Sequence, residues 1–315
     1  MVTGDRGILL DIVKGVCLTV VLFVAYLQVP LLGIGAGVVA PLPVLFYQLK
    51  WGRWLVGVSV VFVTALILVL IGGPSVAMLY LIQAGLLSVV LSHFLARGYS
   101  FSRALASAVL TVAVVAAATV SGYGIVKGID LHGQVTGAIR TNLEQTITLY
   151  TARGATGDDL QFLKEGLEQV GALFGQIYPA MLLVTLVSVA GINLFILRRF
   201  RDRLTVKLPD ATLSSFRNPE HLVWGVIVAG FALLVDNHVV QAAALNVIVV
   251  AGFLYFIQGI AVVAHFFAAY TVPAFFRMFF YVLLVLQAYL ALAVALLGLF
   301  DLWADFRRPR IRKNL

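Results

Sequence analysis

Long uninterrupted apolar stretches dominate this chain, and each is close to the length of a membrane-crossing helix. A helix needs about 20 apolar residues to cross the roughly 30 Å hydrocarbon core of a bilayer. The stretches lack the alternating pattern of barrel strands, so we expect all spans to be helical. The pattern predicts eight spans, over residues 8–28, 30–48, 53–72, 75–96, 102–125, 172–197, 239–270 and 277–300.

Composition supports an all-α polytopic membrane protein. Hydrophobic residues make up 62% of the 315 residues and charged residues 11%, against about 45–50% and 25% in ordinary globular proteins. The mean hydropathy is +1.03. A water-soluble core cannot absorb this much apolar surface, so soluble enzymes and disordered proteins are excluded. The single cysteine, Cys17, also excludes a disulfide scaffold.

Residues 126–171 interrupt the apolar pattern with a polar, periodic segment. Apolar residues recur at helical spacing in two runs, Val135, Ile139, Leu143 and Ile147, then Leu160, Leu163, Leu167 and Val170. Such spacing is typical of amphipathic helices, and Thr156 is a plausible cap for the second one. We therefore expect an external helical hairpin that divides the chain into a five-helix part at 1–125, the hairpin, and a second transmembrane part at 172–315.

A shorter apolar stretch, 222–235, leaves the number of spans open. Its 14 residues correspond to about 21 Å of helix, too short for a straight crossing. It is either a re-entrant or interfacial helix or a short span, so nine or ten spans remain alternatives to eight. Eight spans place both termini and the basic tail, 307–315, on the cytoplasmic side.

Basic residues in the remaining loops agree with this orientation. Lys50 with Arg53, Arg97 with Arg103, and the loop 198–221 are rich in Lys and Arg, which marks cytoplasmic loops. The hairpin falls on the opposite, extracytoplasmic side. Near the start of the chain, Asp11 and Lys14 are three residues apart, which predicts an ion pair at the membrane interface.

Polar residues within the apolar stretches are the candidate ligand contacts. They are Asn246, Gln258, His265 and Gln287. Gln258 and His265 are seven residues apart and therefore share one helix face. These side chains either form hydrogen bonds between helices or line a small polar site near mid-membrane. Among them His265 is the only ionisable group expected deep in the membrane.

Small residues mark a second feature, in the second span. Gly33 with Gly37 and Ala36 with Ala40 are four residues apart, a spacing that lets helices pack closely. The same segment also permits a broken helix with ligand-binding backbone groups.

Exposed arginines are candidate contacts to lipid headgroups or a cytoplasmic partner. They are Arg198, Arg199, Arg201, Arg203, Arg307 and Arg308. Aromatic residues are not interleaved with them, so a nucleic-acid partner is not expected. No zinc-binding, nucleophile-elbow or phosphate-loop motif is present. We therefore expect no metal, no cofactor and no catalytic chemistry.

Several short motifs, taken in order, resemble the YybS-like family of uncharacterised bacterial membrane proteins. They are Pro41-Leu42-Pro43 before Lys50-Trp51-Gly52, Tyr178-Pro179-Ala180, Phe216 to Trp224, Gln258-Gly259, and Asp301-Leu302-Trp303-Ala304-Asp305-Phe306-Arg307-Arg308. The resemblance implies the bacterial plasma membrane as location. It also suggests a distant similarity to substrate-binding subunits of energy-coupling-factor transporters, although the first span lacks their alanine-x-x-x-alanine surface.

Two functional hypotheses follow from these observations. The first is a solute-binding or transport-related membrane subunit, because of the glycine-rich second span and the polar cluster. The alternative is a non-catalytic scaffold or assembly factor, because of the basic surfaces and the external hairpin. Membrane lipids, a second copy of the chain or other membrane subunits are the expected partners, and the ligand is not specified by the sequence.

Overall fold

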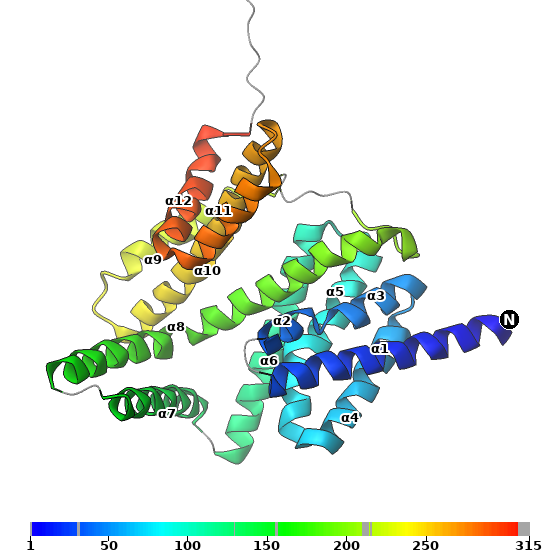
Figure 1. Cartoon of the computed structure of the whole chain (residues 1–315), viewed down its shortest axis with the longest axis horizontal. Helices are drawn as coiled ribbons and strands as arrows, with labels where there is room; N and C mark the ends of the chain where they lie inside the picture. Colours follow the sequence, from blue (N-terminus) through cyan, green and yellow to red (C-terminus); the bar gives the residue numbers. More distant parts are fainter. Residues whose placement is uncertain are drawn as a thin grey trace, which may run out of the picture. The chain divides into compact units, whose positions relative to one another are not determined.

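The computed structural model describes residues 2–29, 32–128, 130–154, 157–209, 214 and 216–307. Regular structure in this part of the chain is helical throughout, as the hydrophobic pattern predicted (Figure 1). The elements are α1 (Val2–Gln28), α2 (Leu32–Val39), α3 (Leu42–Trp51), α4 (Trp54–Tyr80), the π-helix η1 (Leu81–Gly85), α5 (Leu86–Ala96), α6 (Phe101–Lys127), α7 (Leu131–Ala152), α8 (Asp158–Leu197), the 3₁₀-helix η2 (Arg198–Arg203), α9 (Leu222–Ala232), α10 (His238–Ala269), α11 (Ala274–Leu286) and α12 (Ala288–Ala304).

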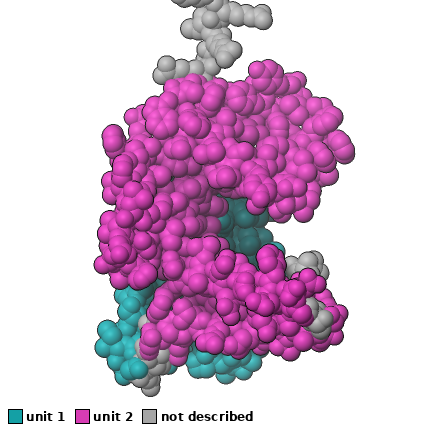
Figure 2. Space-filling view, turned by 90° about the vertical axis from the view of Figure 1, so that its left-hand side faces the viewer, with its two compact units in different colours: residues 1–129, 185–210 teal, residues 130–184, 211–315 magenta. Residues whose placement is uncertain are grey.

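The helices form two compact units, coloured separately in Figure 2. Unit 1 comprises residues 1–129 and 185–210, and unit 2 comprises residues 130–184 and 211–315. The units cut across the three sequence segments expected above, because α8 contributes its first part to unit 2 and its second part to unit 1. The division into three segments stays a prediction.

The core of unit 1 is formed by apolar side chains from α1, α4 and η1. Phe23 of α1 is 1% exposed and contacts the fully buried Tyr80 at the end of α4, with ring centroids 5.3 Å apart in an edge-to-face arrangement. Val60, Leu68 and Ala84 belong to the same buried cluster. This packing holds α1 against α4 and η1.

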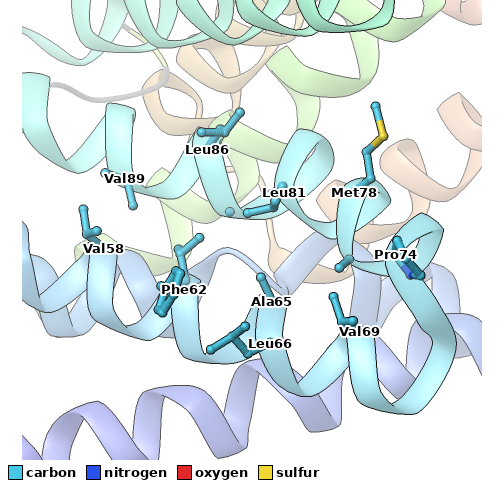
Figure 3. A pocket seen from close by; sticks show the side chains of 13 residues that line it. Val58, Phe62, Ala65, Leu66, Val69, Pro74, Met78, Leu81, Leu86 and Val89 are labelled. Carbon is cyan, nitrogen blue, oxygen red and sulfur yellow. The ribbon is translucent and has the colours of Figure 1, made fainter. Parts of the chain in front are cut away.

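A sharp break at Gly73 divides the apolar stretch from Trp54 to Ala96 into two helices. Gly73 has φ 82° and ψ 177°, a conformation that is costly for residues with a Cβ atom, and Pro74 follows it. The two halves then face each other, since residues from both sides of the break line one apolar groove of about 480 Å³ (Figure 3). The turn expected between residues 72 and 75 is therefore present.

The described residues contain six helical stretches that are long and apolar enough to cross a membrane. The count rises to seven if α11 and α12, which meet at an angle of 108°, form one broken span. α9 has only 11 residues, about 16 Å of helix, which agrees with the expectation that this stretch is too short for a straight crossing.

Unit 2 begins with a helical hairpin formed by α7 and the first part of α8. The predicted apolar stripe on α7 faces α8: a Cβ atom added at Gly171 would lie 2.4 Å from Leu143 Cδ1. Nearer the other end of the hairpin, the rings of His132 and Tyr178 are 5.9 Å apart. The amphipathic hairpin predicted from the periodicity is thus present, while its side of the membrane stays a prediction and Thr156 lies outside the described residues.

The rest of unit 2 is organised around α10, the long helix against which α9 and α12 pack. Glycines permit the closest approach, between α10 and α12. A Cβ atom at Gly259 would lie 1.8 Å from Val294 O, and one at Gly298 would lie 2.0 Å from Tyr255 O. Tyr255 of α10 lies beside Gly298 of α12, and Gly259 of α10 lies beside Val294 of α12. The two helices therefore run antiparallel.

We predict that a methyl group at this crossing destabilises the protein. Gly259→Ala forces α10 and α12 apart, at a cost typical of overpacking, about 1–3 kcal/mol. Gly252→Ala on the same helix is the matched control, since nothing lies within 4 Å of its Cβ position and alanine is the better helix former. Thermal unfolding of the two purified variants should show a lower Tm for Gly259→Ala only; equal values would contradict the close crossing.

Candidate functional site

The ends of two helices meet at the middle of α10. The segment that leads into α9 is fixed there by Asn218, whose Nδ2 donates to Leu254 O at 2.9 Å. The far end of α9 is fixed near the start of α10, where Gln241 Nε2 donates to Val235 O at 3.0 Å. α12 lies along the later part of α10 and ends at Ala304, so its last turn also lies near this point. The meeting point is polar.

A buried ion pair occupies this meeting point. Arg307 Nη2 donates to Asp301 Oδ2 at 2.6 Å, and the two side chains are only 5% and 1% exposed. The other carboxylate oxygen, Oδ1, accepts a hydrogen bond from Phe306 N at 3.2 Å. Asp305, at φ 41°, ends α12 in the left-handed conformation, which turns the chain and carries Arg307 back over the last turn of the helix.

Gln258 connects the ion pair to the segment before α9. Its side chain is 1% exposed. Nε2 donates to Asp301 Oδ2 at 3.1 Å, and Oε1 accepts from the backbone N–H of Asn218 at 2.9 Å. Both ends of the amide are therefore used, as buried polar groups require.

Arg307 also holds the backbone of the segment before α9. Its Nη1 donates to Ser214 O and to Phe216 O, both at 2.8 Å. At the exposed edge, Arg217 forms an ion pair with Asp305. One carboxylate, one guanidinium and two amides thus join α10, the end of α12 and the segment before α9. We call these four side chains, Asn218, Gln258, Asp301 and Arg307, the Asp301 network.

The Asp301 network holds charge in an apolar environment. Its members do not include a nucleophile with an adjacent base, the arrangement that covalent catalysis uses. Among the described residues, no three His, Cys, Asp or Glu side chains are grouped closely enough to bind a metal ion. What the network offers is a buried charge pair and hydrogen-bonding amides at the ends of helices.

Sequence reasoning missed Asp301. It treated His265 as the only ionisable group deep in the apolar segments, and it placed Arg307 at a lipid or partner surface. In the structure Arg307 is instead buried on Asp301. A signal was available: Asp301 is the sole acidic residue between residues 238 and 304, and it lies in the last turn of an apolar helix.

Asn246, a predicted ligand contact, repairs a gap in α8. Pro179 has no N–H and disturbs the hydrogen-bond ladder of the helix. Asn246 Oδ1 accepts from Ala180 N at 2.7 Å, while its Nδ2 donates to Gln176 O, also at 2.7 Å. In a regular helix Ala180 N donates to Gln176 O, so one amide bridges two backbone groups of the turn that contains Pro179. This is the interhelical hydrogen-bonding alternative stated for this residue from the sequence.

The four predicted ligand contacts do not converge in one place. Asn246 is bonded to α8 and Gln258 belongs to the Asp301 network. His265 is partly buried beside Phe266, and Gln287 is exposed at the bend between α11 and α12. Their role in ligand binding stays a prediction.

The small residues of the second span lie where α2 returns along α1. A Cβ atom at Gly33 would lie 2.7 Å from Tyr26 O, and one at Gly37 would lie 2.6 Å from the Tyr26 ring. Ala40 is fully buried and Ala36 partly buried. The helix also breaks after Val39, at Ala40 and Pro41, so close packing and a broken helix occur together.

Of the remaining charged residues singled out from the sequence, all but Arg308 belong to unit 1. Arg199, Arg201 and Arg203 are exposed, and Arg198 lies 5.8 Å from the ring of Phe101. Arg308 lies outside the described residues. Asp11 differs from expectation: its carboxylate accepts from Lys50 Nζ at 2.5 Å and from Trp51 Nε1 at 2.9 Å, on α3, and the predicted partner Lys14 is exposed.

Helices of membrane-crossing length, broken helices and buried polar networks define an integral helical membrane protein. Comparison with known families agrees. Residues 17–302 match the model of the family described as "Predicted membrane protein (DUF2232)", so the chain belongs to this family. No curated protein and no solved structure matches the chain. An uncharacterised membrane protein family was expected from the sequence, and the finer likeness to YybS-like proteins and to energy-coupling-factor subunits stays a prediction.

We predict that Asn246 and Pro179 are energetically coupled. Asn246→Leu removes the acceptor of Ala180 N, which belongs to a buried residue, and the donor to Gln176 O, whose residue is exposed. The loss at Ala180 N costs about 1–3 kcal/mol. In a Pro179→Ala background the new N–H at 179 can donate to Gly175 O and, without the ring, Ala180 N can donate directly to Gln176 O, so the same substitution should cost less. A double-mutant cycle by chemical unfolding measures this coupling; additive effects would contradict it.

We also predict that removing one half of the ion pair costs more than removing both halves. Loss of one partner of a buried pair leaves an uncompensated charge and costs about 3–5 kcal/mol. Arg307→Gln alone should therefore destabilise the protein more than Arg307→Gln combined with Asp301→Asn. Unfolding measurements on the single and double variants check this order. A double variant with a lower free energy of unfolding than the single variant would contradict burial of the pair.

Proposed function

We propose that this protein is a transport-related membrane subunit without catalytic chemistry, and that the Asp301 network is the centre of its transport function. The supporting observation is the buried pair of Asp301 and Arg307 at the place where the ends of α9 and α12 meet the middle of α10. Charged side chains inside a membrane are expensive and are mostly kept where ions or solutes are handled.

The helices around the network have the form that this function needs. Transporters often build their binding sites from discontinuous helices whose ends lie within the membrane. Here α9 has 11 residues, and α11 and α12 bend by 108° at their junction. The uncharged amides of Asn218 and Gln258 beside one ion pair favour a small polar or amphipathic solute over a bare metal ion.

The orientation that we propose follows the charges. The break at Gly73 turns one of the six candidate stretches into two, and the bent pair adds another, which gives eight. Both termini, Lys50, Arg97 and η2 then lie on the cytoplasmic side of a bacterial plasma membrane, and the α7–α8 hairpin lies on the other side. The positive-inside rule supports this arrangement.

Thermal unfolding in detergent against a panel of vitamins, nucleosides, amino acids and lipids tests the function. A solute that binds only the folded protein stabilises it by about 2.7 kcal/mol at a hundredfold excess over its Kd. We expect at least one member of the panel to raise the Tm of the wild type, and Gln258→Leu to lose this shift. The control is Gly252→Ala on the same helix, which should keep the shift.

A flat response from every class of solute, together with recovery of a protein partner by crosslinking in membranes, would contradict the transport proposal. It would favour the second candidate, a non-catalytic scaffold. The observation behind that candidate is the exposed basic end of α8, where Arg199, Arg201 and Arg203 are exposed on η2. Neutralising these three arginines should then abolish partner recovery.

A further inference from the structure

The segment Phe216–Asn218 is held on unit 2 mainly by polar contacts to its backbone. Arg307 Nη1 binds Phe216 O, and Gln258 Oε1 accepts from Asn218 N. Asn218 adds one side-chain bond to Leu254 O. By contrast, the side chain of Arg217 is about half exposed and Phe216 is only partly buried. Little apolar surface fastens this segment.

The helices beneath the segment are held by a different kind of contact. α10 and α12 pack through Gly259 and Gly298, where the backbones approach so closely that no Cβ atom fits. That crossing includes none of the hydrogen bonds that hold Phe216–Asn218. Parts of a protein that share few contacts open with separate free energies. The segment can therefore detach while the helix crossing stays intact.

We infer that Phe216–Asn218 is a releasable strap, and that Arg307, held in place by Asp301, is the latch that fastens it across the α10–α12 crossing. Arg307 is the positioning residue: it binds the strap backbone with one nitrogen and the buried carboxylate with another. Loss of the latch frees the strap without unfolding the bundle.

The strap controls where α9 begins, because the helix starts at Leu222, four residues after Asn218. Releasing the strap detaches the beginning of α9 from Leu254, while Gln241 still holds its far end through Val235 O. The short helix then stays attached to α10 through its packing against that helix. The use of strap release in solute passage rests on the proposed function, whereas the latch itself does not.

Hydrogen–deuterium exchange of the full chain in lipid nanodiscs tests the latch without any solute. The readout is the backbone amide of Asn218, which Arg307 does not touch directly. We expect Arg307→Gln to raise its exchange rate at least tenfold, and Asp301→Asn to raise it in the same direction because Arg307 loses its charged partner. Arg277→Gln is the matched control, because it removes an arginine that also binds two backbone oxygens, Val272 O and Phe267 O, but outside the strap, and it should leave the rate unchanged.

Two results would overturn the inference. An unchanged rate at Asn218 in both Arg307→Gln and Asp301→Asn would show that the strap is fastened by something else. A rise that extends equally over α10 and α12 would show that the ion pair supports the whole bundle rather than a strap. If Arg307→Gln and Asp301→Asn are both too unstable to purify, the ion pair supports the whole bundle, which is the second result. A flat solute panel together with partner recovery by crosslinking would contradict the transport proposal, and a tenfold rise at Asn218 would still support the latch.

Discussion

The arrangement of unit 2 depends on a carboxylate and a guanidinium, those of Asp301 and Arg307, that are almost completely removed from water. Burying such a pair is favourable only if the geometry is good and the remaining polar atoms find partners. Asp301 meets both conditions through Arg307, Gln258 and the Phe306 N–H. The same side chains fix the position of the segment before α9, because Arg307 Nη1 and Gln258 Oε1 bind its backbone. Three elements distant in sequence are joined by one charge pair.

Close backbone contact complements this network. The glycines of the α10–α12 crossing bring the last turn of α12 within reach of Gln258, which a bulkier residue at Gly259 would prevent. In α8, Asn246 performs a related task by bonding Ala180 N and Gln176 O in the turn that contains Pro179. In both places a polar side chain in an apolar segment completes the backbone geometry of another helix. The absence of water in a bilayer makes such completion obligatory.

Elements with strong local signals were predictable from the sequence. Apolar length identified the helices, the four-residue spacing identified the α7–α8 hairpin, and the boundary between the predicted spans 53–72 and 75–96 identified the turn. The network was not predictable, because its members come from residues 218, 258, 301 and 307 and only the left-handed turn at Asp305 brings the last two together. Likewise, the partner of Asp11 is Lys50, 39 residues away, rather than the nearby Lys14. Helix spacing describes one helix at a time and cannot rank contacts between helices.

The depth of the Asp301 network in the bilayer decides whether the network can act inside the membrane. A nitroxide attached to the thiol introduced by Gly252→Cys, in a Cys17→Ser background, would report from the middle of α10, at a position with open space around it. In liposomes, we predict strong relaxation by oxygen and weak relaxation by a water-soluble nickel complex, as in hydrocarbon. Relaxation dominated by the nickel complex, as expected for a label at the exposed Arg140 on α7, would place the Asp301 network in water and contradict an intramembrane role.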